Sequence, residues 1–318
     1  MDVETGAVVA LQILAICSIV AALLAYLMRQ SRNTDEEFDM RNKRHVLVTS
    51  CDTCIGLQIA LALSEAGYKV FAGLLEPEGN SHAIKILRAV QTQKEKEQDP
   101  SSMEGAMGLD VRAPGQIVPL ELDPTREDSL HSCLDAVRSK LPAGEDGLWA
   151  VVHTGGLALP GIIEKQESSA WESMLRHNLV APLRTARVFI PLLRAKKGRI
   201  ILLGDSGSSY GTKAGTGLVA FSASRKAVEG AAEALRAELL SSEIDVVLLK
   251  PPAVNPIALY STPVLKTSEN SSSTAHVAGV WTAPLTTYSV TNSLASALIS
   301  PNPKNVYDIA MKPRTFCR

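Results

Sequence analysis

The sequence predicts a doubly wound α/β domain, built on a mainly parallel sheet of seven strands and preceded by one N-terminal transmembrane helix. From residue 44 onward, short apolar runs alternate with amphipathic stretches, which is typical of strands and helices that alternate along a chain. Most connections between these runs are short, which favours parallel strands with helices on both faces. The chain has 318 residues, enough to bury one sizeable core.

Six short apolar runs predict six of the strands, and they cover residues 45–49, 69–73, 116–122, 148–152, 199–203 and 244–249. Helices are expected over residues 55–66 and 171–193, and from about 220 to 240. Pro191 lies inside the second of these and indicates an early end or a kink. A last helix and a seventh strand within residues 289–307 are implied by the resemblance to a known family that is described below.

The N-terminal stretch over residues 7–28 is uncharged and rich in Ala, Leu, Ile and Val. At ~1.5 Å per residue, a helix of this length crosses a ~30 Å hydrocarbon core. A cleaved signal peptide is the competing interpretation, but it calls for basic residues before a shorter apolar run, whereas Asp2 and Glu4 precede this one. We therefore predict a short tail over residues 1–6 and a transmembrane anchor over 7–28.

The charges that follow this stretch predict its orientation. Arg29, Arg32 and Arg41 come after the anchor, and the positive-inside rule then places the rest of the chain in the cytosol. The expected location is the endoplasmic reticulum membrane, with a linker over residues 29–43 and the main domain over 44–318. A polar segment over residues 91–112 predicts a surface insertion in this domain.

The overall composition excludes some classes of function. The net charge is −1, charged residues make up 20% of the chain and aromatic residues 4%, so a nucleic-acid partner is not expected. The five cysteines show no paired framework, which indicates a reducing compartment for the main domain. We predict no metal site.

The segment at residues 221–230 reads Phe-Ser-Ala-Ser-Arg-Lys-Ala-Val-Glu-Gly and follows a predicted strand and a Gly/Ser-rich loop. It resembles the active-site helix of the short-chain dehydrogenase/reductase family, whose hallmark there is Tyr-x-x-x-Lys. Phe221 stands in the tyrosine place and Arg225 in the lysine place. The resemblance covers about residues 43–309 and implies a Rossmann-type fold. It also implies NAD or NADP as the cofactor, if a cofactor is bound.

Two further motifs resemble the branch of that family that contains the 17β-hydroxysteroid, retinol and 3-hydroxybutyrate dehydrogenases. Residues 149–156, Trp-Ala-Val-Val-His-Thr-Gly-Gly, are similar to its Trp-Ala-Val-Ile-Asn-Asn-Ala-Gly. Residues 251–263 are similar to its substrate segment, with Pro252 in place of a glycine. The resemblance therefore implies a hydrophobic, steroid- or retinoid-like small molecule as ligand.

The turn over residues 49–56 joins the first strand to its helix, where backbone N–H groups and the helix dipole favour an anion such as a pyrophosphate. It resembles the family's Thr-Gly-x-x-x-Gly-x-Gly, with Thr49 and Gly56 kept. Ser50 and Cys54 stand in the two other glycine places, where a Cβ hinders a phosphate. The spacing of Cys51 and Cys54 also fits a thioredoxin-like redox pair, but the downstream elements run too long for that domain.

Further cofactor residues are implied at the ends of later strands. Asp123 matches the aspartate that caps the adenine in the family, and a helix N-cap is the competing interpretation. His153 and Thr154 replace the family's two asparagines before Gly155, and His153 is expected to be a structural substitute. Leu74 and Leu75 stand where an acidic residue would bind the ribose, so the choice between NAD and NADP cannot be predicted.

The family's catalytic set is an Asn, a Ser, a Tyr and a Lys. Asn178 matches the first, and the serine place falls at Asp205 or Ser206, with Ser208 as a further candidate. Phe221 has no proton to exchange with a substrate, although Arg225 keeps a positive charge that can bind ribose hydroxyls. Tyr210 on the preceding loop is the candidate substitute for the missing phenol. Its competing interpretation is an ordinary loop aromatic.

Two functions follow from these residues. The favoured one is a membrane-anchored family member of lipid or steroid metabolism with impaired catalysis, which binds a lipid or a partner chain. The helix over residues 220–240 is a face that many relatives use for homo- or heterodimers. The alternative is an active NAD(P)-dependent steroid or retinoid alcohol oxidoreductase with a substitute proton relay.

Overall fold

The computed structural model describes residues 19–24, 26, 44–97, 115–144, 146–205, 217–265 and 281–309. The chain divides into two compact units, Met1–Lys43 and Arg44–Arg318. In the first unit the described residues are helical, but most of the predicted anchor at 7–28 lies outside them. Within the described part of the chain, no helix is long and apolar enough to cross a membrane. The predicted anchor and domain bounds therefore stay predictions.

Seven strands form one sheet in the second unit, in the order β3-β2-β1-β4-β5-β6-β7. All six neighbouring pairs are parallel, including His45 opposite Lys69, which confirms the predicted fold class of the domain. The strands are β1 (His45–Val48), β2 (Lys69–Leu74), β3 (Ile117–Glu121), β4 (Ala150–His153), β5 (Arg199–Leu203), β6 (Asp245–Lys250) and β7 (Val306–Asp308).

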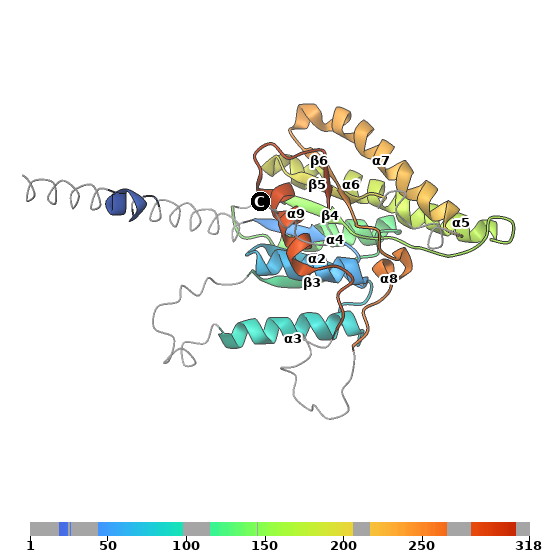
Figure 1. Ribbon diagram of the computed structural model, residues 1–318, viewed down its shortest axis with the longest axis horizontal. Helices are drawn as coiled ribbons and strands as arrows, with labels where there is room; N and C mark the ends of the chain where they lie inside the picture. Colours follow the sequence, from blue (N-terminus) through green and yellow to red (C-terminus); the bar gives the residue numbers. More distant parts are fainter. Residues whose placement is uncertain are drawn as a thin grey trace, which may run out of the picture. The chain divides into compact units, whose positions relative to one another are not determined.

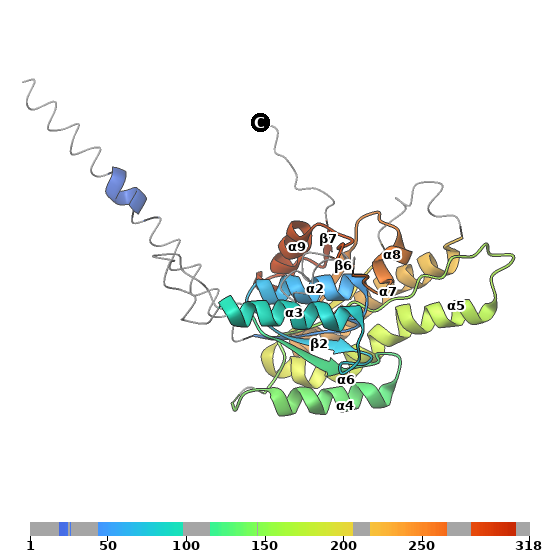
Figure 2. The same ribbon diagram turned by 90° about the horizontal axis from the view of Figure 1, so that it is seen from below.

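Helices cover both faces of the sheet (Figures 1 and 2). One face carries α2 (Cys54–Glu65), α3 (His82–Glu97) and α9 (Thr287–Ile299), and the other carries α4 (Glu127–Lys140), α6 (Ala181–Lys196) and α7 (Val219–Leu239). Because side chains alternate along a strand, Val46 and Val48 join the core under α2, whereas Leu47 joins the core under α6. The two apolar cores pack on the two faces of the sheet. The residues after the strands, at its carboxyl edge, are therefore the ones that can form a site.

Two helices differ from the sequence prediction. α3 continues to Glu97, so the first part of the segment at 91–112 is helical. The long helix expected over 171–193 is three elements: α5 (Ser168–Leu175), a π-helical turn η2 (Arg176–Val180) and α6, which does not end early at Pro191. Pro191 and the carbonyl it leaves without a partner, that of Arg187, are on exposed residues, where water can replace the lost hydrogen bond.

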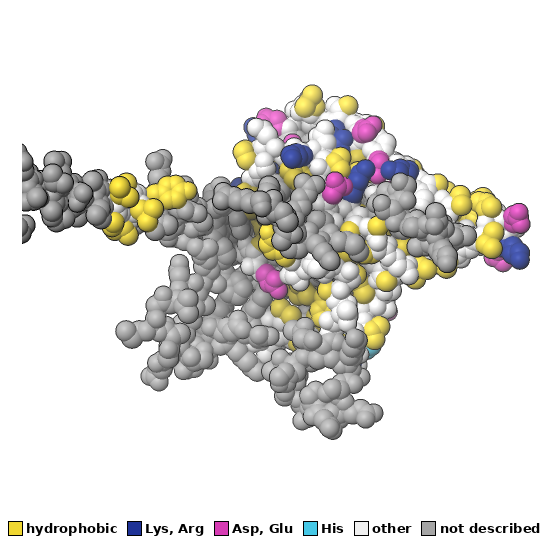
Figure 3. All heavy atoms as spheres, viewed as in Figure 1, with side chains coloured by type: hydrophobic (Ala, Val, Ile, Leu, Met, Phe, Trp, Pro, Cys, Tyr) yellow, Lys and Arg dark blue, Asp and Glu magenta, His cyan; other side chains and the backbone are white. Residues whose placement is uncertain are grey.

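Charges of both signs are mixed over α7 on the face shown in Figure 3. Glu229 on this helix contacts Lys226 at 3.1 Å and Lys250, at the end of β6, at 3.1 Å. A short helix, α8 (Pro256–Tyr260), follows β6 and packs against α2. This contact brings the chain after β6 over the carboxyl edge of the sheet.

Candidate functional site

The candidate site lies at the carboxyl ends of β1 and β4, between which the strand order reverses. Such a switch point is where doubly wound sheets bind their ligands. Thr49 and Ser50 follow β1 directly, and the residues from His153 to Gly156 end and follow β4. The sequence-predicted cofactor residues of the two strands are therefore brought together, while Asp123 lies further out, after β3.

The turn after β1 keeps the backbone of a glycine-rich turn without its glycines. Ser50 has φ 52°, in the left-handed region that favours glycine. Its carbonyl accepts hydrogen bonds from Thr53 N at 3.0 Å and Thr53 Oγ1 at 2.9 Å. A Cβ on Gly56 would collide with the Ser50 carbonyl, so the turn packs directly on the first turn of α2. Ser50 thus bears the backbone strain that the missing glycine would have avoided.

Backbone N–H groups at the N-terminus of α2 donate hydrogen bonds to other groups of the same chain. Thr53 caps it by accepting from Gly56 N at 3.1 Å. Cys54 N donates to the Ser261 carbonyl at 2.8 Å, and the Cys54 Sγ lies 3.7 Å from Ser261 Oγ. The Cys54 and Gly56 N–H groups, which would otherwise face an anion, therefore have partners from this protein.

The two cysteines of the turn are free thiols in the structure. Cys51 is fully buried and its thiol donates to the Val48 carbonyl at 3.4 Å. Burial raises the pKa of both the Cys51 and the Cys54 thiols above the ordinary value. A reactive redox cysteine needs a lowered pKa, so this environment does not favour the redox-pair interpretation.

The end of β4 is bound to the end of β1 by hydroxyl groups. Thr154 N donates to Thr49 Oγ1 at 3.2 Å, and Thr154 Oγ1 donates to the Thr49 carbonyl. His153 is buried, with its Nδ1 3.3 Å from Thr49 Oγ1. Burial and the nearby charge of Arg225 lower the pKa of His153 to about 3, so the ring is neutral at physiological pH. His153 therefore fits the structural place that the sequence predicted.

Asn178 lies in the π-helical turn η2 and is fully buried. Its Oδ1 accepts from Leu157 N at 2.7 Å, and its Nδ2 donates to the Leu157 carbonyl and to Ser224 Oγ, both at 2.9 Å. Ser224 Oγ in turn donates to the Phe221 carbonyl at 2.7 Å. Asn178 thus joins the loop after β4 to η2 and α7, and the amide hydrogens of its side chain are both used in doing so.

Phe221 lies on α7 with 2% of its surface exposed. It packs in an apolar cluster with Ala158, Met174 and Leu218, and its ring centroid lies 5.9 Å from that of Tyr260. The place that would hold the family's tyrosine is therefore apolar. The ring supplies packing there and no acid or base.

Arg225 is one helical turn further along α7 and is 1% exposed. Its Nη2 donates to the Gly155 carbonyl at 2.9 Å and its Nη1 to the Leu203 carbonyl at 3.3 Å. The guanidinium carbon lies 4.4 Å from the centroid of the Tyr260 ring, a cation–π geometry. Arg225 thus bonds to the backbone after β4 and β5 and to a ring that follows β6.

Comparisons with known proteins bear out this architecture. A family model described as short chain dehydrogenase matches residues 106–261. Similar curated proteins are the mitochondrial D-beta-hydroxybutyrate dehydrogenase of Rattus norvegicus, 25% identical over 69% of this chain, and estradiol 17-beta-dehydrogenase 2 of Mus musculus, 25% identical over 72%. The chain belongs to the short-chain dehydrogenase family. The matches cover 57% and 53% of these relatives, so the chain spans little more than half of their length.

The fold is also that of solved members of the family. A metagenomic short-chain oxidoreductase in complex with NADP aligns over 66% of this chain and 82% of its own, with a TM-score of 0.51 and 20% identity. The fold therefore holds a nicotinamide dinucleotide in that protein.

Several contacts among the described residues of this chain lie where a dinucleotide would approach the turn after β1 and the end of β4. The Cys54 N–H is bonded to Ser261, and Ser50 carries a side chain in the turn. A Cβ on Gly156 would collide with Arg225 Nη2 and come within 2.5 to 2.7 Å of the Tyr260 ring, so these two side chains fill the space beside that glycine. We call the region at the carboxyl ends of β1, β4 and β5 the cleft. Among the described residues, Ser261 bonds at its α2 side, and Arg225 and Tyr260 pack at its β4 side.

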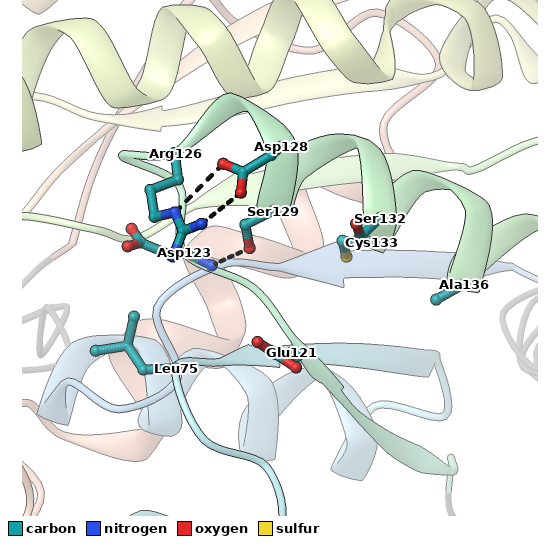
Figure 4. Close-up of a pocket in the computed structure, with 9 residues that line it drawn as sticks. All are labelled: Leu75, Glu121, Asp123, Arg126, Asp128, Ser129, Ser132, Cys133 and Ala136. Atoms are coloured by element: carbon teal, nitrogen blue, oxygen red, sulfur yellow. Dashed lines mark hydrogen bonds and ion pairs between the residues drawn. The ribbon is translucent and has the colours of Figure 1, made fainter.

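A pocket of about 430 Å³ lies nearer the expected adenine end, between the ends of β2 and β3 and the helix α4 (Figure 4). Leu75 and Glu121 line one side, and Arg126 and Ser132 line the other. Asp123 does not cap α4, whose N-cap is Arg126; its Oδ1 accepts from Thr125 N and Thr125 Oγ1 at 2.9 and 2.6 Å. The N-cap interpretation of Asp123 is therefore wrong.

Some predicted site residues lie outside the described part of the chain, namely Ser206, Ser208 and Tyr210. Asp205 is described and buried, 3.9 Å from Lys226. Sequence reasoning missed Ser224, Tyr260 and Ser261, although the last two stand in the segment at 251–263 that carries the branch resemblance. Their contacts with Arg225 and Cys54 come from residues far apart in the sequence, and no local pattern marks such contacts.

Proposed function

We propose that this chain is a membrane-anchored short-chain dehydrogenase in which hydride transfer is impaired, and that it acts by binding a steroid- or retinoid-like lipid. The observation that carries the proposal is Phe221, which is buried in an apolar cluster at the tyrosine place. Loss of a general acid or base typically lowers a rate by ~10²–10⁴-fold. Arg225 does not restore the function, because a guanidinium stays protonated and here bonds to backbone carbonyls.

The lipid ligand is supported by the relatives, among them the estradiol dehydrogenase, whose name gives a steroid as its substrate. Equilibrium dialysis with labelled estradiol and retinol tests this point. Binding by the wild-type chain is expected, with the same affinity in the Phe221→Tyr variant, because binding does not need the missing phenol. Absence of binding to both lipids contradicts the proposal.

An active oxidoreductase with NAD or NADP is the second candidate, favoured by the buried Asn178 network, which is complete. Tyr210 would then supply the phenol. Turnover of steroid and retinoid alcohols, followed by nicotinamide absorbance, separates the two. We expect background rates in the wild type. Turnover that Tyr210→Phe abolishes would establish the second candidate instead.

A variant with Ser50→Gly, Cys54→Gly, Phe221→Tyr and Arg225→Lys tests the cause of the impairment. The four changes restore the family's residues in the turn and on α7. Dinucleotide binding and measurable turnover are expected in this variant and not in the wild type. A folded variant that remains inactive contradicts the assignment of the impairment to these four side chains.

The membrane anchor at residues 7–28 is part of the proposal, with the endoplasmic reticulum as its location and the main domain in the cytosol. Its support is the uncharged stretch and the arginines that follow it. In this orientation the acceptor sequence Asn270-Ser-Ser272 stays unmodified. An endoglycosidase-sensitive mass shift that is absent in Asn270→Gln would contradict it.

We also propose a homo- or heterodimer through the helix over residues 220–240. Val219 at its start and Leu240 at its end are 53% and 78% exposed, and Leu175 on the neighbouring α5 is 43% exposed. Light scattering of the purified chain is expected to give a dimer mass that Val219→Asp and Leu240→Asp reduce to a monomer. An unchanged mass in both variants contradicts this face.

A further inference from the structure

The cleft at the carboxyl edge of the sheet contains chemical groups of the chain itself that resemble those of a bound ligand. At the α2 N-terminus, the Ser261 carbonyl accepts from Cys54 N at 2.8 Å. A helix N-terminus of this kind accommodates anionic oxygens, and a carbonyl oxygen satisfies the same N–H donors. Ser261 is 207 residues away from Cys54 in the sequence and reaches it because α8, which it follows, packs against α2.

Beside β4, the second filled position is made by Arg225 and Tyr260. The guanidinium stacks on the Tyr260 ring at 4.4 Å and donates to the Gly155 and Leu203 carbonyls. Tyr260 also contacts Phe221, with centroids 5.9 Å apart and the rings tilted by 57°. Gly156 has no room for a Cβ because these two side chains occupy the space above it. An aromatic ring, a cation and two carbonyls are thus packed at the carboxyl ends of β4 and β5.

The two filled positions are adjacent in the chain, since Tyr260 ends α8 and Ser261 follows it. One short segment therefore contacts both β4, through Arg225, and α2, through Cys54. We infer that residues 260–261, held by Arg225, form an internal plug that takes the place of a dinucleotide in the cleft. The plug rests on the proposed function in one respect, namely that lipid binding by this chain needs no dinucleotide.

Cys54 reports directly on the plug, because the residue is 7% exposed and its thiol lies 3.7 Å from Ser261 Oγ. The test is alkylation of the full-length chain, with the rate at each cysteine followed by mass spectrometry. In Tyr260→Ala we expect Cys54 to react about tenfold faster and NADH to bind about tenfold more tightly than in the wild type. Cys133, buried in α4 away from the plug, is the internal reference and keeps its rate.

Tyr260→Phe is the matched control, because it keeps the ring on Arg225 and removes only the hydroxyl. Its Cys54 rate is expected to equal that of the wild type. Arg225→Lys removes the planar cation, so it is expected to act like Tyr260→Ala. If circular dichroism shows that Tyr260→Ala is unfolded, the Cys54 alkylation rate of Arg225→Lys replaces it as the test.

Two results overturn the plug. One is an unchanged Cys54 rate in folded Tyr260→Ala and Arg225→Lys. The other is NADH binding that is equally weak in those variants and in the wild type, which would leave the proposed function standing. Turnover of alcohols by the wild-type chain, in contrast, contradicts the proposed function whatever the Cys54 rate.

Discussion

The strands β1 and β4 differ sharply from the few residues that follow them. Within the strands, Val46, Val48 and Val152 are buried against helices as the apolar pattern predicts. Directly afterwards, Ser50 and Thr154 replace family residues, and His153 does so at the last position of β4. The fold depends on the packed faces of the sheet, so these changes at its edge leave the topology intact. In this chain, the residues that build the sheet are therefore physically separate from the residues that would carry the chemistry.

The cleft itself shows the same contrast on a smaller scale. On one side, Asn178 keeps three hydrogen bonds that join η2, α7 and the loop after β4. On the other, Phe221, Arg225 and Tyr260 replace a polar catalytic pair with packed rings and a cation. The retained side holds the structure together, and the changed side is where the chemistry would take place. The predictions below test this division.

The largest expected effect is the pH dependence of stability that His153 causes. Its pKa is about 3 in the folded chain, below the ordinary 6.5, so only the unfolded chain binds this proton between those values. Above pH 6.5 His153 is neutral in both the folded and the unfolded chain and causes no loss of stability. Below pH 6.5 the unfolded chain takes up the proton, so the free energy of unfolding falls by up to ~1.4 kcal/mol per pH unit. Urea unfolding measured from pH 7 to 4 should show that the free energy of unfolding falls less steeply with decreasing pH in His153→Asn than in the wild type. Equal slopes would contradict a buried neutral ring.

Asn178→Ala is expected to lower the free energy of unfolding by about 3 kcal/mol, because it removes the partners of the part-buried Leu157 N–H and carbonyl and of the buried Ser224 hydroxyl. Chemical denaturation measures the loss. Asn292→Ala on the exposed surface of α9 is the matched control and is expected to change stability by less than ~0.5 kcal/mol. Similar losses in the two variants would mean that the Asn178 side of the cleft does not hold the structure.

Ser50→Gly is expected to raise the stability slightly, by up to ~1 kcal/mol, because φ 52° strains a serine and not a glycine. Lys197→Gly is the matched control, with φ 48° at the end of α6 and far from the cleft. Thermal unfolding should show similar small gains in both. Only Ser50→Gly should improve NADH binding. Equal NADH binding in the two variants would mean that the strain at Ser50 does not affect binding in the cleft.

Much of the fold could be predicted from the sequence, because period-two and helical apolar patterns act locally and the connections are short. The parallel pairing of the strands and the position of Phe221 on its helix follow from such patterns and from the family motif. The π-helical turn that holds Asn178 could not be predicted, since the apolar periodicity of residues 171–193 indicates one continuous helix. The contact between Arg225 and Tyr260 joins residues 35 positions apart through the packing of α8, which leaves no local signal.

If Arg225 and residues 260–261 fill the cleft of this chain, the wild-type chain does not hold a dinucleotide. Calorimetric titration of the full-length wild-type chain with NADH, and separately with NADPH, tests it most directly. We expect no binding heat for either dinucleotide up to about 1 mM, where the binding free energy is only ~4 kcal/mol. Saturable binding of either one in the micromolar range would contradict it.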